Sequence, residues 1–355
     1  MDRATTRRRT EALIRRCHAG LGPEQLHDEV LTRLRGLMSI DAAFLATVDP
    51  ATLLFTSATS EAPLDAAASL FLENEFGQPD VNKFAQLAAA DGVARSLDDA
   101  TGHDRGRSPR GREILAPLGL GDELRVALRC GSSTWGVLCL HREAAATGFS
   151  DAEAALVASL APHIAAGLRR GVVLGPSFDD DVAGAAGLVV LDAGAFAITS
   201  ANVAGERLLA ELGASARPGL TRAPILLEAV ARRALHERGS DTARARLRSP
   251  DGHWLVVEAS VLRDGDGGQQ VAVVIEHADG RELMSLILAA FELTAREQSV
   301  AELVLRGYST RQIVDELRIS RYTVQDHLKA VFAKFGVGSR RELVASVLGA
   351  GATRT

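Results

Sequence analysis

The chain has 355 residues, of which 46% are hydrophobic and 24% are charged, an ordinary composition for soluble globular proteins and enough length for two or three domains. Its three cysteines, Cys17, Cys130 and Cys139, are odd in number and lack metal-binding spacing, which excludes a disulfide framework and favours the cytoplasm. No apolar run reaches the roughly 18 residues of a membrane helix, and the basic N-terminal stretch has no apolar core, so we expect neither membrane insertion nor export.

Helical and strand patterns alternate over the first 172 residues. Apolar spacing predicts helices within residues 10–36, with a break from Gly20 to Pro23. Period-two patterning then predicts four strands, at residues 41–48, 53–58, 124–130 and 135–141. The stretch 78–122 between the two strand pairs is loop-rich and includes a charged segment, TGHDRGRSPRGRE, that we expect to be poorly ordered.

A long helix closes this region. Ser150 and Glu153 form its start signal, and Pro162 should kink or split it. This order of elements resembles a GAF domain, and the likeness is carried by APLGLGDELRVAL and WGVLCLHREAAATGFSDAEAALVASLAPHIAAGL. The resemblance implies a GAF-like sensor or dimerisation domain over residues 1–172.

A linker rich in Gly, Pro and Asp, residues 173–186, separates the next domain. Strand patterns then occur at residues 187–191, 196–199, 254–262 and 270–277, with helical patterns from Asn202 and from Pro224. The arrangement resembles a PAS domain, through GLVVLDAGAFAITSANVAGERLL and GHWLVVEASVL. We therefore expect a PAS-like domain at 187–280 and a helical connector at 281–292.

Four helix-start signals follow in residues 293–355. Three of them pair a hydroxyl with Glu or Gln three residues later, and the fourth is a lone Ser: Thr294 with Glu297, Ser309 with Gln312, Ser339 with Glu342, and Ser320. Glycines stand where left-handed closing residues are wanted, at Gly307, Gly336 and Gly349. Only Arg318, Ile319 and Ser320 separate the second and third helices, so these should cross steeply, as in a helix-turn-helix.

Positive charge gathers on the third helix of this unit. Residues 318–341 hold six basic residues and one acidic residue. Of the chain's 40 basic and 45 acidic residues, ten and seven lie within 291–355, which leaves an excess of eight acidic residues in 1–290. A basic helix face on an acidic protein is the footprint expected of a protein that binds duplex DNA.

The C-terminal unit resembles the LuxR/FixJ-type helix-turn-helix of bacterial transcription regulators, through LTAREQSVAELV, GYSTRQIVDEL and RISRYTVQDHLKAVFAKFGVGSRREL. Arg318 is a departure, because the family often has Gly or a similar residue there. The resemblance implies that three residues read base edges: Gln325, Asp326 and Lys329. It implies phosphate contacts from ten others: Ser309, Thr310, Ser320, Arg321, Tyr322, Thr323, His327, Lys334, Ser339 and Arg340.

Those three base-reading residues suit the chemistry of the major groove. Gln suits adenine, Asp accepts from the cytosine amino group, and Lys donates to guanine, each good pair discriminating by about 1–3 kcal/mol. Three contacts do not hold a site alone, so the family resemblance implies a homodimer on two half-sites of double-stranded DNA. RNA polymerase is left open as a further partner. We expect a multidomain α+β protein, a DNA-binding transcription regulator, and not an enzyme.

No cofactor is predicted, and whether the GAF-like or PAS-like domain takes a small-molecule ligand stays open. There is no G-x-x-x-x-G-K-[ST] motif, which excludes the nucleotide-driven class of large LuxR-type regulators. A haem-dependent sensor variant would depend on His236, His253 or His277, although a lone histidine is more often structural.

The sequence leaves two further alternatives. A thiol enzyme on the GAF-like domain would use Cys130 and Cys139, but pairing of residue 130 with 135 places these cysteines beyond disulfide reach. The acidic upstream part could also dock on the basic third helix and silence it.

Overall fold

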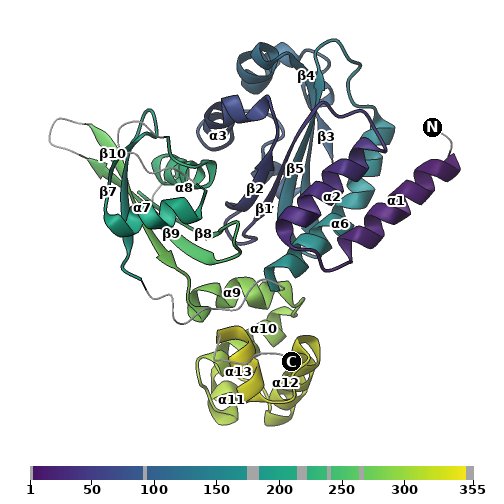
Figure 1. Cartoon of the computed structure of the whole chain (residues 1–355). Helices are drawn as coiled ribbons and strands as arrows, with labels where there is room; N and C mark the ends of the chain where they lie inside the picture. The colour runs from purple at the N-terminus through teal and green to yellow at the C-terminus, as the bar shows by residue number, and fades with distance from the viewer. Residues whose placement is uncertain are drawn as a thin grey trace. The chain divides into compact units, whose positions relative to one another are not determined.

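The computed structural model describes residues 3–90, 94–173, 184–213, 222–237, 241–263 and 268–348. The chain forms two compact units, one holding residues 1–174 and 184–276 and the other beginning at His277. The first unit contains two α/β domains on antiparallel sheets and the second is helical, so the expected fold class is confirmed (Figure 1). In the described part of the chain, no helix is long and apolar enough to cross a bilayer.

The first domain is a five-stranded antiparallel sheet in the order β2-β1-β5-β4-β3. Its strands are β1 (Ala42–Val48), β2 (Phe55–Ser60), β3 (Arg95–Ser96), β4 (Leu120–Cys130) and β5 (Ser133–Glu143). Its helices are α1 (Arg3–Cys17), α2 (Pro23–Arg35), α3 (Ala68–Phe76), α4 (Phe84–Ala89), α5 (Leu97–Thr101) and α6 (Asp151–Val173), with short turns η1 (Leu64–Ala67), η2 (Arg105–Arg107), η3 (Gly111–Leu115) and η4 (Ala116–Leu118). Helices α1, α2 and α6 lie on one side of the sheet and α3 on the other (Figure 1).

Helix α6 packs closely on the sheet because Gly136 of β5 has no side chain. A Cβ there would lie 2.4 Å from a Leu168 methyl group and 2.8 Å from the Ala46 carbonyl oxygen. Helix α6 runs through Pro162 as one element, so the expected split does not occur. The start signal is confirmed, since Ser150 Oγ accepts from the Glu153 N–H at 3.4 Å and Glu153 accepts from the Ser150 N–H at 3.0 Å.

Two expectations for this domain were wrong. The β4–β5 turn is shorter than predicted, so Cys130 pairs with Ser133, not with residue 135, and Cys139 pairs with Arg125. The two cysteines therefore lie even farther apart along the hairpin. The charged segment expected to be poorly ordered instead forms helical turns, because Arg110 within it is fully buried and ion-paired.

The second domain repeats the strand order of the first, β7-β6-β10-β9-β8. Its elements are β6 (Gly187–Asp192), β7 (Ile198–Ala201), α7 (Val203–Glu211), α8 (Ile225–His236), β8 (Thr242–Arg248), β9 (Trp254–Arg263) and β10 (Gln269–His277). Sequence analysis missed β8, in which Arg244 and Arg246 alternate with inward Ala243 and Ala245, because so few residues in it favour strands. The linker predicted at 173–186 lies mostly outside the described residues.

The two sheets meet through α8 of the second domain and α3 of the first. Arg232 of α8 pairs with Glu228 at 2.9 Å and with Glu73 of α3, and Ser69 of α3 donates to Glu228. Glu228 and Arg232 are buried. Leu54 of the first domain also packs into the second core. The two domains therefore pack against one another through this interface, which is called the joint below.

Candidate functional sites

The second unit begins with helix α9 (Gly280–Ala290), followed by α10 (Ala295–Leu305), α11 (Thr310–Leu317), α12 (Arg321–Phe335) and α13 (Arg340–Leu348). The capping boxes at Thr294 and Ser309 are present, and Ser320 Oγ accepts from the Thr323 N–H at 3.0 Å. Ser339 caps α13 through the Glu342 N–H at 3.2 Å. The Glu342 carboxylate differs from a standard box, since it accepts from the Gly338 N–H and the Ser339 hydroxyl.

The helix ends also follow the expected pattern where the structure describes them. Gly307 and Gly336 have φ of +84° and +67°, the left-handed region in which glycine is unstrained. Gly349 lies outside the described residues. Arg318 closes α11 with φ +52°, so the non-glycine residue at this family position does adopt the left-handed conformation, at a cost of about 1 kcal/mol. The short turn to α12 is thereby formed despite the departure.

Helix α12 has one buried and one exposed face. Val324, Leu328, Val331 and Phe335 are buried. The three residues predicted to read bases, Gln325, Asp326 and Lys329, are all exposed on the outer face. Lys329 Nζ lies 3.9 Å from Asp326 Oδ1, and the Lys329 side chain is 78% exposed, so this pairing leaves the ammonium accessible.

Eight of the ten residues predicted to contact phosphate lie at or near the start of a helix. Arg321 and Tyr322 are exposed in the first turn of α12, and Ser309, Ser320 and Ser339 cap three helix starts, where backbone N–H groups favour anions. Thr310, Thr323 and His327 are half-buried beside them.

Two of the residues predicted to contact phosphate, Lys334 and Arg340, also have partners within the helical unit. Lys334 Nζ donates to Glu297 Oε2 at 2.6 Å and to the Glu292 carbonyl oxygen at 2.9 Å. Arg340 donates to the Tyr308 carbonyl oxygen at 2.8 Å and to Thr310 Oγ1 at 3.1 Å. Burial raises the pKa of Glu297, but hydrogen bonds from Lys334 and the Thr294 N–H outweigh it and hold that pKa below its usual value. Both basic residues fasten helices together.

Helix α9 lies where a helical connector was expected at residues 281–292, and it begins with a start signal of its own. Asp279 and Glu282 form a capping box at its start, a D-x-x-E signal that could have been read from the sequence. Phe291, just after α9, stacks on Phe335 at the end of α12, with ring centroids 3.7 Å apart. Helix α9 also contacts α10 and α13, so it belongs to the helical unit.

A second candidate site lies inside the first domain. A cavity of about 40 Å³ touches Phe44, Phe55, Phe71, Glu75 and Phe84 on one side. On the other side it touches four side chains of the central hairpin, Glu123, Arg125, Cys139 and His141, all at most 3% exposed. The cavity is large enough for about two or three water-sized groups.

Burial and charge set the protonation states around this cavity. Burial lowers the pKa of His141 to about 4 and raises the pKa of Cys139 to about 12. Burial also raises the pKa of Glu123, but the guanidinium groups of Arg110 and Arg125 outweigh it and hold that pKa at about 2. The resting cluster therefore contains a neutral imidazole, a thiol and a carboxylate.

Comparison with known proteins agrees with the two domain types. Residues 292–347 match the family described as bacterial regulatory proteins, luxR family, and residues 22–168 match the GAF domain. The chain therefore carries a LuxR-family DNA-binding helix-turn-helix domain at its C-terminal end and a GAF domain before it.

Similarity to individual proteins is local. Over 51 residues the chain is 47% identical to an Aeromonas salmonicida protein described as an HTH-type transcriptional regulator in the exeN 3′ region. The matched segment is 14% of this chain and 26% of that protein. Among solved structures, the Vibrio cholerae VqmA dimer is 20% identical, with 46% of this chain and 82% of that chain covered and a TM-score of 0.20. The GAF domain of an Acinetobacter phosphoenolpyruvate-protein phosphotransferase is 13% identical, with coverage of 50% and 99% and a TM-score of 0.35.

Proposed function

We propose that the protein is a cytoplasmic, homodimeric, sequence-specific transcription regulator whose GAF and PAS-like domains receive a signal. The observation that carries the proposal is the exposed face of Gln325, Asp326 and Lys329 on a capped helix-turn-helix whose sequence matches the luxR family. We assign base reading to these three residues and phosphate contact to the exposed residues around them. The domain boundaries proposed from the sequence are 1–172, 187–280 and 293–355.

A selection from random duplex DNA with the full-length protein tests this function. We expect one enriched motif with two half-sites roughly one helical turn apart, bound at least about a thousandfold more tightly than random duplex. Equal, salt-sensitive affinity for every duplex would contradict the proposal.

Two single changes separate base reading from phosphate contact. Lys329→Ala should relax preference at one base position, at a cost of about 1–3 kcal/mol on the best site. Arg321→Ala should weaken binding to all sequences alike and reduce the slope of log affinity against log salt by about one. Arg340→Ala is less informative, because Arg340 also holds α13 to α11. Arg296→Ala, an exposed charge removal on α10, is the matched control and should leave base preference unchanged.

Silencing by the acidic upstream region stays a proposal, and the structure improves its test. The fragment should begin at His277, because any cut within residues 280–290 would divide α9. Release from silencing predicts a higher affinity of 277–355 for a single half-site than the full chain shows. Equal or lower half-site affinity would argue against it.

No observation favours the alternative functions. The thiol enzyme needs Cys130 and Cys139 within reach of one another, and the hairpin register keeps them apart. The haem variant depends on His236, His253 or His277, and an optical spectrum of the purified protein tests it.

A further inference from the structure

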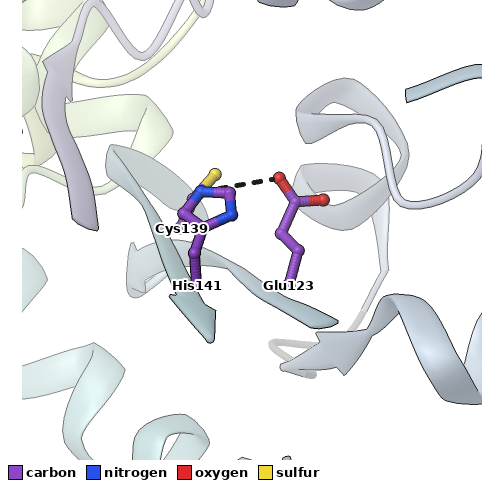
Figure 2. Close-up of side chains that lie close together, drawn as sticks. All are labelled: Glu123, Cys139 and His141. Carbon is purple, nitrogen blue, oxygen red and sulfur yellow. Dashed lines mark ion pairs between the residues drawn. The ribbon is translucent and has the colours of Figure 1, made fainter. Parts of the chain in front are cut away.

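Two neighbouring strands of the first sheet place four polar side chains side by side. In the β4–β5 pairing, Glu123 lies opposite His141 and Arg125 lies opposite Cys139. Residues two apart on a strand share a face, so all four point to the side of the sheet that holds the cavity. Figure 2 shows the Glu123 carboxylate, the Cys139 sulfur and the His141 ring converging.

The converging atoms are close and incompletely satisfied. One potential ligand atom from each of Glu123, Cys139 and His141 lies within 4.8 Å of the others, and His141 Nε2 is 3.9 Å from Glu123 Oε1. His141 Nδ1 is buried without a hydrogen-bond partner among the described residues, and Glu123 Oε1 lies 3.0 Å from Arg125 Nε in an ion pair whose geometry does not make a hydrogen bond. A buried ring nitrogen without a partner is costly and calls for an explanation, of which a bound metal ion is one.

The charges around the cluster do not balance. Three buried carboxylates, from Glu75, Asp80 and Glu123, face the two guanidinium groups of Arg110 and Arg125, which pair with them at 2.7–3.5 Å. One negative charge is left over in a site from which water is largely excluded. A thiolate at Cys139 would add a second negative charge, so one divalent cation bound there would bring the cluster to neutrality.

We propose that Glu123, Cys139 and His141 bind a divalent transition-metal ion of the zinc type. The ligands would be Glu123 Oε1, Cys139 Sγ and one imidazole nitrogen, a mixed O, S and N set that suits Zn²⁺. Zinc holds such atoms at about 2.0–2.3 Å, which places them about 3.5 Å apart, so modest side-chain rotations would close the site. Glu123 Oε2, held by Arg110 at 2.7 Å, fixes the carboxylate from behind.

The fourth tetrahedral position would face the cavity, which has room for a water molecule or a small ligand of the metal. Binding requires the Cys139 thiol to lose its proton, which leaves to solvent as the metal–sulfur bond forms, while the neutral imidazole and the carboxylate lose none. This site goes beyond the proposed DNA-binding function, and metal binding without DNA tests it separately.

The experiment uses the full-length protein, freed of metal with a chelator and then titrated with Zn²⁺ or Co²⁺. We expect one ion per chain, release of one proton per ion into weak buffer, and, with Co²⁺, the thiolate charge-transfer band and the visible bands of a tetrahedral ion. Cys139→Ser should abolish the charge-transfer band and weaken Zn²⁺ binding at least on the order of a hundredfold. Cys130→Ser, on the same hairpin, is the matched control and should bind as the unchanged protein does.

A competing zinc site must be separated from this one. His18 Nε2 and His163 Nδ1 lie 3.2 Å apart on the surface, and Cys17 precedes His18 in the chain. His163→Ala should therefore leave the cobalt spectrum and the stoichiometry unchanged. Circular dichroism of each variant establishes that it is folded, and Glu123→Gln, which keeps the carboxylate shape, gives a second ligand change.

Three outcomes would overturn the proposal: no thiolate band with Co²⁺, equal Zn²⁺ affinity in the unchanged protein and Cys139→Ser, or loss of the ion in His163→Ala alone. A selection from random duplex DNA with Cys139→Ser distinguishes failure of the metal-site proposal from failure of the proposed DNA-binding function. A variant that lacks the metal and still enriches the same DNA motif separates the two.

Discussion

The two sheets of the first unit have the same strand order, but the buried side chains of their central strands are polar in one sheet and aliphatic in the other. In the first, the central hairpin β4–β5 turns Glu123, Arg125, Cys139 and His141 inward. In the second, the corresponding strands β9 and β10 turn aliphatic residues inward, all fully buried: Leu255, Val257, Val271, Val273 and Ile275. One topology therefore supports a filled core in one domain and a polar, partly hollow core in the other.

The two cores are therefore stabilised in different ways. An aliphatic core is stabilised by burial of each side chain, whereas a buried charge network is stable only while every member keeps its partners. The chain offers a direct reporter for each sheet, because Trp135 lies in β5 and Trp254 begins β9, and these are its two tryptophans. Replacing either with Phe leaves the fluorescence of the other to follow one sheet.

The largest effect is expected from Arg110→Met. Arg110 is fully buried. Its guanidinium group donates to the Glu123 carboxylate at 2.7 Å, to the Asn74 side-chain oxygen at 2.9 Å and to the Val81 carbonyl oxygen at 3.1 Å. Its loss leaves the buried Asp80 carboxylate without its ion-pair partner and Glu123 with Arg125 alone, and should lower the free energy of unfolding by about 3–5 kcal/mol. Denaturant unfolding followed by Trp135 fluorescence measures it.

A double change sharpens that result. Adding Glu123→Gln to Arg110→Met removes one of the two carboxylate charges that lost Arg110, so part of the lost stability should return and the two changes should couple. A cost for Arg110→Met below about 1 kcal/mol would mean that water enters and solvates the network.

The next effect concerns the joint at which the two sheets meet. Arg232→Met deprives the buried Glu228 and the half-exposed Glu73 of their shared partner, and should lower stability by about 2–4 kcal/mol. Both tryptophans should report it, since the joint belongs to both domains. Arg263→Met removes an exposed ion pair at the far end of β9 and should change stability by less than about 1 kcal/mol. A shift seen by only one tryptophan would show that the domains unfold independently.

The third effect is acid sensitivity of the first domain. Burial lowers the pKa of His27 to about 4, while its ordinary value is 6.5. The unfolded chain therefore binds the proton first, so this contribution is complete above pH 6.5 and is lost as pH falls from 6.5 to 4, by up to about 3 kcal/mol.

His27→Gln should flatten the acid limb measured by Trp135 fluorescence, because Gln cannot take up that proton and can still bond to Thr59. His103→Gln, at an exposed histidine, should reproduce the unchanged acid profile. An acid limb as steep in His27→Gln as in the unchanged protein would contradict this account.

The smallest effect lies in the helical unit, outside both sheets. Arg318→Gly relieves a left-handed backbone and should raise the free energy of unfolding by about 1 kcal/mol. Arg311→Gly, two turns earlier in the same helix, has a helical backbone and should lower it by up to about 1 kcal/mol. Calorimetry of the full chain should show both shifts in one transition. Shifts of the same sign would contradict the backbone explanation.

Local signals gave the helical unit almost completely, because its helices are defined by caps and stops that lie within a few residues of one another. Thr294, Ser309 and Ser320 each make the predicted capping bond. The polar cluster could not be found this way. Arg110 and Glu123 are separated by a folded segment, and the segment around Arg110 looks solvent-exposed in sequence until the sheet brings its partners together.

Strand β8 was missed for a related reason, since its pattern of Ala and Arg resembles a surface segment and only pairing with β9 makes it a strand. The predicted hairpin register was off by two residues at the turn, because the turn is shorter than expected. It was off by one residue beyond the β-bulge between Leu128 and Arg129, which is invisible in a period-two pattern.

The stacked rings of Phe291 and Phe335 hold the end of α9 against α12, and the ion pair between Lys334 and Glu297 beside them holds α12 to α10. These contacts tie α9 to the helices that follow it, within the unit that begins at His277. A chimera that joins another upstream domain to this DNA-binding unit should therefore be joined before Asp279, so that α9 and its capping box stay with the helices that α9 contacts.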